Sequence, residues 1–338
     1  MANSNSKFDV KTHILEKICE DIEAGNLPWE RKWSSSGLPS NAISGRNYNG
    51  LNLLYLWLMA DIKGYSTDRW ITFNQARSIG ANYCKSTKKW TPKEGFEDNL
   101  PTVRKGEKST YIMCPVMIDR KDKDGKPVLN KSGKPDKVLV GFKPGFVFNL
   151  DQIDNLPKSF TESEKAPFDP GVDGIAALER LEDIARLMGV PIIERGDSCS
   201  YSPSKDRIMM SPKDSFKDPV DFIRVLAHEL SHSTGHKTRL DRPDFHVPSG
   251  KWSPEYAFEE LVAELSAAMT CCQLGIEYKS AHATYIHHYL EVIKEAHIDV
   301  DKRKGNTLMK AANMASAASQ FLLDVETINE EQLVAAES

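Results

Sequence analysis

Apolar residues recur every three to four positions in five long stretches of this chain, a spacing that places them on one face of an α-helix. These stretches are residues 8–25, 51–62, 174–188, 218–235 and 254–274. Short runs rich in β-branched and aromatic residues instead predict strands at residues 70–73, 111–118, 137–150, 191–194 and 207–210. Helices and strands that follow one another without regular alternation favour the α+β class.

A proline-rich segment divides the chain into two predicted domains. Residues 151–174 carry three prolines among Ser, Glu and Gly, which is typical of a linker. We therefore predict a mixed α+β domain at residues 1–150 and a mainly helical domain with a small sheet at residues 175–325, followed by an acidic tail at residues 326–338. Turn signals within residues 119–136 predict a long, solvated hairpin extension between two strands of the first domain.

Charge is distributed unevenly between these predicted domains. Residues 1–150 hold 24 Lys and Arg against 16 Asp and Glu, which gives +8, while the remainder holds 20 against 32, which gives −12. A basic half joined to an acidic half indicates that only the first half meets nucleic acid. The alternative is a chance division of solvated surface.

Membrane and secretory signals are missing from the sequence. No apolar run approaches the roughly 20 residues that a bilayer-crossing helix needs. The first ten residues lack the apolar core of a signal peptide, and the six cysteines are scattered without a C-x-x-C pair. We therefore expect a cytoplasmic protein with reduced thiols and no membrane partner.

The strongest chemical signal is the H-E-x-x-H motif formed by His228, Glu229 and His232 in a predicted helix. That helix has an N-cap candidate at Asp218 and a proline, Pro219, at its first position. Four residues advance a helix by about 40° beyond a full turn, so both imidazoles lie on one face and can bind one zinc ion. Glu229 borders that face and is the predicted catalytic base, because it can take a proton from the water that zinc activates. The alternative is a helix with two ordinary histidines.

Zinc requires a third protein ligand. The metzincin pattern places a histidine where this chain has Thr238, and the lone His236 fits a cap or surface position better. The next helix is a better source, because Glu260 and Glu264 share one of its faces, whereas Glu259 is expected to face solvent. We assign Glu260 as the ligand and Glu264 as a hydrogen-bonding partner of a ligand histidine. The reverse assignment stays open, as does an ordinary salt-bridged helix face.

Three ligands and a base predict hydrolytic chemistry, most naturally that of a peptidase. The strand at residues 207–210 is expected to line a peptide substrate as an added strand. Tyr201 and His236 are the candidate groups for stabilising an oxyanion.

Cations and aromatic residues interleave through residues 28–111, where residues 82–108 are predicted to be basic loops. Single-stranded nucleic acid favours this combination, because cations follow the phosphates while aromatic faces stack on bases. No signature of a duplex-reading motif is present. For each single aromatic residue a place in the core is the commoner alternative. The predicted DNA contacts are Trp29, Trp33, Tyr48, Arg69, Trp70, Lys88, Lys89, Arg104, Lys105 and Lys108.

Together these segments resemble the ArdC-type antirestriction proteins of conjugative plasmids. The resemblance lies in residues 22–33, 38–41, 45–52, 69–76, 103–108, 228–235, 239–242 and 259–264. It implies an N-terminal single-stranded-DNA-binding domain shared with plasmid conjugative primases, and a C-terminal zincin-like metallopeptidase domain. It also implies a role in protecting incoming single-stranded plasmid DNA from restriction by the host.

Three hypotheses for the function follow. In the first, the protein binds single-stranded DNA and its zinc peptidase acts on a DNA-bound protein or a restriction enzyme. In the second, it coats DNA without catalysis, and the zincin-like domain serves structure or protein contact. In the third, it is an intracellular peptidase with a basic accessory domain. The sequence does not identify the peptide substrate, the oligomeric state or a nucleotide preference.

Overall fold

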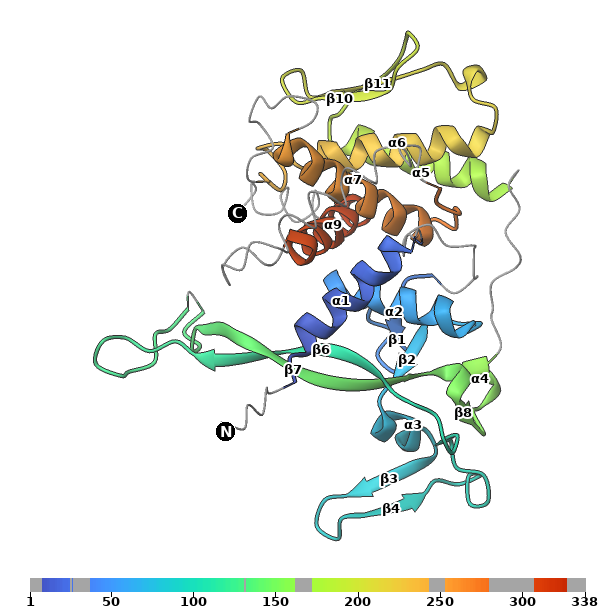
Figure 1. Cartoon of the computed structure of the whole chain (residues 1–338), viewed down its shortest axis with the longest axis vertical. Coiled ribbons are helices and arrows are strands. Elements are labelled where there is room, and N and C mark those ends of the chain that lie inside the picture. Colours follow the sequence, from blue (N-terminus) through green and yellow to red (C-terminus); the bar gives the residue numbers. More distant parts are fainter. Residues whose placement is uncertain are drawn as a thin grey trace.

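A computed structural model describes residues 8–24, 26, 37–130, 132–161, 172–242, 253–279 and 307–326 of the 338-residue chain. Helices and strands are mixed, as the α+β prediction requires. The N-terminal half holds two projecting hairpins, and the helices of the C-terminal half lie together at the other end of the molecule (Figure 1).

A four-stranded sheet of order β1-β2-β7-β6 forms the centre of the N-terminal half. β1 (Ser40–Asn41) runs parallel to β2 (Arg69–Ile71), and β7 (Lys137–Asn149) is antiparallel to both β2 and β6 (Thr110–Asp119). Two helices, α1 (Val10–Glu23) and α2 (Gly50–Lys63), pack against each other and against this sheet. The apolar stripe of α1 is buried, as its spacing predicts, and comprises Val10, Ile14, Ile18 and Ile22.

The predicted hairpin extension continues the long β6–β7 ribbon (Figure 1). The two strands pair from Thr110 with Val147 to Asp119 with Lys137, with a register shift between Val116 and Met117. Beyond them, isolated bridges join residue 121 to 127 and residue 129 to 135. Two successive turns therefore prolong the ribbon where the sequence places its Asp-Gly and Ser-Gly turn signals.

Short elements complete the N-terminal half. Thr72 and Gln75 form a capping box at the start of α3 (Phe73–Gly80). This helix leads into a hairpin of β3 (Ala81–Cys84) and β4 (Lys89–Pro92). The segment that the sequence predicts to be loops thus contains a hairpin. The prediction missed it because short strands with exposed polar residues lack the burial pattern that marks a strand.

The first residues of the predicted linker belong to this half of the fold. A 3₁₀ turn, η1 (Leu150–Gln152), precedes β8 (Ile153–Asp154), which pairs with β5 (Thr102–Val103). A short helix, α4 (Lys158–Thr161), follows. Residues 162–171 and the predicted acidic tail beyond residue 326 lie outside the described residues, so the domain boundaries stay a prediction.

The C-terminal half stacks helices against a small sheet, as predicted. Its elements are α5 (Val172–Leu187), β9 (Ile192–Glu194), β10 (Ser200–Ser202), β11 (Arg207–Met210), η2 (Lys213–Ser215), α6 (Pro219–Ser233), α7 (Pro254–Gln273) and α9 (Thr307–Leu323). The sheet order is β10-β11-β9. Because β11 is the central strand, both of its edges are already paired, and the prediction that residues 207–210 take up a peptide strand is wrong.

Helix α9 joins the two halves, because it packs on α7 and also on α2. At the contact with α2, the N–H of Gly50 donates to Ser316 Oγ at 3.0 Å. Gly50 has a φ of +54°, and a Cβ atom there would lie 2.0 Å from Asn313 Oδ1. One continuous cluster of buried apolar residues runs through both halves.

All six cysteines are free thiols, in agreement with the expectation from their spacing. Among the described residues, no helix has the length and apolar content needed to cross a bilayer.

Candidate metal centre

The ends and the apolar stripe of α6 set the position of the H-E-x-x-H motif. Asp218 accepts a hydrogen bond from the N–H of Val220 at 2.9 Å, and Pro219 is the first helical residue, as predicted. Phe222, Leu226 and Leu230 are buried in the core. Packing on that side turns the two histidines toward α7, whose start is capped by Ser253.

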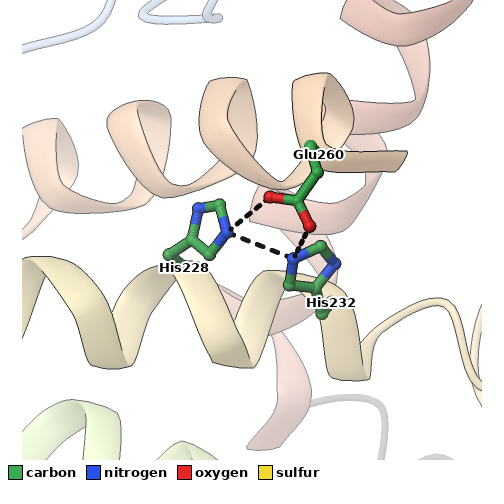
Figure 2. A group of neighbouring side chains, drawn as sticks. All are labelled: His228, His232 and Glu260. Atoms are coloured by element: carbon green, nitrogen blue, oxygen red, sulfur yellow. Dashed lines mark hydrogen bonds and ion pairs between the residues drawn. The ribbon is translucent and has the colours of Figure 1, made fainter. Parts of the chain in front are cut away.

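Three side chains from α6 and α7 converge in the buried space between these helices (Figure 2). Glu260 of α7 places one carboxylate oxygen 3.4 Å from His228 Nε2 and the other 3.5 Å from His232 Nε2. The two Nε2 atoms are 3.1 Å apart. One ligand atom from each residue lies within 4.8 Å of the others, and among the described residues this is the one such group of His, Cys, Asp and Glu.

The donor spacing fits a divalent metal. Ligand atoms that surround a zinc ion tetrahedrally at about 2.0–2.1 Å stand about 3.3 Å from one another. The three observed separations lie close to this edge length. Two imidazoles and one carboxylate are also a donor set that zinc binds in catalytic sites, where a fourth position stays open.

Each imidazole is oriented from behind by a different glutamate of α7. His228 Nδ1 lies 3.2 Å from Glu264 Oε2, and His232 Nδ1 lies 3.1 Å from Glu259 Oε1. A carboxylate at Nδ1 keeps the proton on that nitrogen, so the lone pair of Nε2 points at the space between the helices. Glu264 thus lies behind His228, and its supporting role stays a prediction.

Glu259 does not face solvent as the helix angles suggested. Besides its contact with His232, its carboxylate receives two hydrogen bonds from the guanidinium of Arg242, one of them from Nε at 3.0 Å. Arg242 is itself buried and also donates to the carbonyl of Ser231 at 3.1 Å. The turn after α6 thus supplies a cation that holds Glu259 against His232. Arg242 follows His232 by ten residues, inside a segment that carries the family resemblance, and is the signal that could have indicated this contact.

The carboxylates determine the protonation of the metal-free centre. Burial lowers the pKa of both imidazoles, but Glu260 and Glu264 raise the pKa of His228 well above 6.5. Glu260 and Glu259 likewise raise the pKa of His232 to about 9. Burial alone would raise the pKa of Glu260, yet the two imidazoles hold it well below its usual range. A divalent cation therefore replaces protons when it binds here.

The remaining predicted groups are Glu229, Tyr201 and His236. Glu229 is 5% exposed and follows the first ligand histidine on α6. The hydroxyl of Tyr201 donates to Asp206 Oδ1 at 2.6 Å, and that carboxylate also pairs with Arg239. His236 lies 2.8 Å from the hydroxyl of Thr238. Tyr201 is thus part of an ion-paired cluster, and its role in an oxyanion site stays a prediction.

Comparison with known proteins agrees with this geometry. A family model described as the N-terminal domain of anti-restriction factor ArdC matches residues 8–148, and one described as a zincin-like metallopeptidase matches residues 179–303. Crystal structures of the antirestriction ArdC protein from the R388 plasmid are similar to this chain in metal-free form, with a TM-score of 0.68 and 29% identity. The Mn(II)-bound form of that protein has a TM-score of 0.67 and 30% identity over 94% of this chain and 98% of its own.

The chain belongs to the ArdC family. Its two-domain architecture, with a zincin-like C-terminal domain, is that of the family. The Mn(II)-bound relative and the donor set described above identify the centre as a site for a divalent metal.

Other relatives differ in length. A DNA primase TraC of Escherichia coli is 32% identical over 301 residues, which is 85% of this chain but 18% of the primase. The protein y4eC of Sinorhizobium fredii is 31% identical over 294 residues, 85% of each chain. The ArdC-like chain therefore spans less than a fifth of this primase and most of the shorter relative.

Among the described residues of this ArdC family member, none of the predicted aromatic DNA contacts is an exposed side chain. Trp29 and Trp33 lie outside the described residues. Trp70 is fully buried against Leu56 and Val147, so its indole has no face to offer a base, and that prediction is wrong. Tyr48 is half-buried against the core.

The predicted cations divide into two groups. Arg69 donates to the carbonyl of Phe160 at 3.2 Å, and Arg104 pairs with Glu107 at 3.2 Å. These two arginines thus have structural partners. Arg104 is nevertheless exposed, as are the four predicted lysines Lys88, Lys89, Lys105 and Lys108.

Proposed function

We propose that this ArdC-family chain binds single-stranded plasmid DNA as it enters a host and protects it from restriction, and that its metal centre is a zinc peptidase acting on proteins bound to that DNA. The observation that carries the proposal is the buried centre of His228, His232 and Glu260 with a glutamate, Glu229, beside it. This is the minimal set for metal-assisted peptide hydrolysis.

The residues divide the work as follows. When bound, zinc supplies Lewis-acid polarisation of the scissile carbonyl and lowers the pKa of water. Glu264 and Glu259 keep the Nε2 lone pairs of His228 and His232 directed at the metal position. Glu229 accepts the proton of the attacking water and delivers it to the leaving amine.

Two observations support single-stranded DNA as the partner: the net charge of the N-terminal half and the similarity to known proteins. Residues 1–150 carry a net charge of +8, and four of the predicted DNA-contacting lysines are exposed there. Such a surface favours association with a polyanion. The similar proteins include an antirestriction protein from the R388 plasmid and a DNA primase, and this similarity supports DNA as the partner.

The peptidase is tested with the full-length chain, a fluorescent peptide library and a protein bound to a single-stranded oligonucleotide. We expect zinc-dependent cleavage that EDTA stops and zinc restores. Glu229→Gln removes the base and is expected to lower the rate by at least about a hundredfold. Glu255→Gln, an exposed glutamate of α7, is the matched control and is expected to cleave normally. Cleavage that persists undiminished in Glu229→Gln contradicts the proposed chemistry.

A second candidate is a protein that coats single-stranded DNA without catalysis. One observation favours it: α9 of the C-terminal half covers α2 of the N-terminal half, so the zincin-like part supports the fold of the DNA-binding part. In that case Glu229→Gln leaves protection of DNA unchanged.

A further inference from the structure

The β3–β4 hairpin is a cationic projection of the N-terminal half that carries no acidic residue. Residues 81–93 contain four lysines and no Asp or Glu. One of them, Lys93, is anchored, because its Nζ donates to the carbonyls of Ser78 at 2.7 Å and Ile79 at 3.0 Å. The other three lie at the turn end, are exposed and form no ion pair with any described residue; they are Lys85, Lys88 and Lys89.

A pair of aromatic rings lies on one face of this hairpin. Tyr83 of β3 is directly opposite Trp90 of β4 in the antiparallel register. The ring centroids are 5.1 Å apart with an interplanar angle of 47°, and the guanidinium of Arg77 lies 5.7 Å from the centroid of Trp90. Tyr83 is 48% exposed. A partly exposed aromatic pair therefore lies on the hairpin, with Arg77 beside Trp90 and exposed lysines toward the turn.

These rings do not belong to the core of the protein. Neither residue is part of, or packed against, any of the three buried apolar clusters. The hairpin contacts α3 at its base and otherwise projects away from the body (Figure 1). Its base is fixed by Lys93 and by Phe96, which packs over Gly80. Cross-strand aromatic pairs stabilise hairpins, but half-exposed rings amid three unpaired lysines indicate a ligand as well.

The chemistry of this surface selects an unpaired nucleic-acid strand. Bases of a duplex are stacked on one another and offer no free face, whereas a single strand can place a base on an exposed aromatic ring. Lysine side chains beside the rings reach the flanking phosphates without reading sequence. An acidic protein segment would use the lysines alone and would leave the rings without a role.

We propose that the β3–β4 hairpin is the base-stacking platform for single-stranded DNA, with Tyr83 and Trp90 holding bases and Lys85, Lys88 and Lys89 holding phosphates. The proposal rests on the proposed function, because it locates the strand whose binding that function requires. The base-stacking role first predicted for the buried Trp70 thus passes to two rings that are partly exposed.

The test measures binding of a fluorescein-labelled (dT)₂₀ strand to the full-length chain by anisotropy at several salt concentrations. Trp90→Leu and Tyr83→Leu are each expected to weaken binding about fivefold or more, because a stacked base is lost. Trp90→Phe and Tyr83→Phe keep a ring and are expected to restore most of the affinity. Changing the three hairpin lysines to Gln is expected to reduce the slope of log K against log salt by about 2 in magnitude.

Matched controls come from the other hairpin. Phe146 is 49% exposed and sits opposite Tyr111 in β6, so Phe146→Leu removes a comparable ring from a comparable pair. Changing Lys121, Lys123 and Lys126 to Gln removes three lysines beyond the end of the β6–β7 ribbon. Both controls are expected to bind (dT)₂₀ like the wild type. The unfolding temperature of each variant separates loss of binding from loss of the hairpin.

The outcomes distinguish this proposal from the proposed function. A wild-type chain that does not bind (dT)₂₀ overturns the proposed function. A wild type that binds while the leucine variants bind equally well overturns the platform alone. A loss with the lysine variants but not with the leucine variants also overturns it, because it indicates an anion surface without stacking.

Discussion

At the scale of single residues, the chemistry of the metal centre depends on side chains that do not touch the metal position. Glu264 and Glu259 lie behind His228 and His232, and Arg242 holds Glu259 in place. Partners of this kind orient the ligand imidazoles and raise their basicity, and their loss typically lowers metal affinity 10- to 100-fold.

We therefore predict that Glu264→Ala and Glu259→Ala each weaken zinc binding by about 10- to 100-fold. Competition with a chromogenic chelator measures this, and Glu255→Ala on the exposed side of α7 is the control. Wild-type affinity in both variants would show that the imidazoles are oriented by something else.

The protonation of His232 leads to a second prediction. Its pKa is raised from about 6.5 to about 9 in the folded, metal-free chain, so the protonated imidazole stabilises that state. The contribution is fully present below pH 6.5 and is lost as the pH rises through about 9. We expect the unfolding temperature of EDTA-treated protein to fall over this range, and that of zinc-loaded protein to stay higher and to fall less. A flat profile without metal contradicts the pairing of His232 with Glu260 and Glu259.

Cys84 is a cysteine whose thiol the local structure makes more acidic. Hydrogen bonds from Ser86 and Thr87 lower the pKa of its exposed thiol to about 6, so the thiolate predominates at neutral pH. Iodoacetamide at pH 7 is expected to label Cys84 before the other five cysteines, as peptide mapping will show. Ser86→Ala is expected to shift the midpoint of the labelling rate to higher pH. Preferential labelling of another cysteine contradicts this.

Sequence reasoning brought four of the site residues to the correct neighbourhood because helical spacing is regular. His228, His232, Glu260 and Glu264 all lie at the α6–α7 contact. Glu259 was misplaced because helix angles describe one helix alone, whereas the crossing of α6 and α7 puts two neighbouring glutamates on either side of His232. Angles within an element do not determine how elements cross.

At the scale of elements, the long helices and the apolar short strands β2, β9 and β11 could be predicted, whereas the exposed short strands could not. Caps at Asp218 and Ser253 and the apolar stripes define α6 and α7 in the sequence. β3 and β4 are four residues long and largely exposed, so they carry no period that distinguishes them from loops. The hairpin proposed to bind DNA was hidden in the sequence for this reason.

The contact between α2 and α9 yields a prediction at this scale. Gly50→Ala adds a Cβ that must displace Asn313 and also strains a positive φ. Gly64, at the other end of α2, has a φ of +65° with open space around it, so Gly64→Ala carries the backbone strain alone. We expect about 1 kcal/mol of destabilisation for Gly64→Ala and distinctly more for Gly50→Ala in urea unfolding. Equal losses of unfolding free energy in the two variants would show that α9 does not pack closely against Gly50.

At the scale of the whole molecule, the two halves share one apolar core although the sequence divides them by charge and by a proline-rich segment. The distribution of charge along the sequence describes the protein surface and does not indicate which helices pack together in the core. Residues 1–150 alone would leave the face of α2 that meets α9 uncovered. We expect this fragment to be less stable than the same residues in the full chain, as circular dichroism during heating will show. An independently stable fragment that still binds DNA contradicts the shared core.

The proposed function requires the buried metal centre to work together with DNA binding by the N-terminal half. Its most direct test is the transfer of a plasmid into a restricting recipient, with the wild-type chain or with Glu229→Gln, in which zinc and (dT)₂₀ binding are first shown to be intact. The account predicts that the wild type raises the number of recipients carrying the plasmid and that Glu229→Gln does not. Full protection by Glu229→Gln would contradict the account and leave the metal centre a structural role.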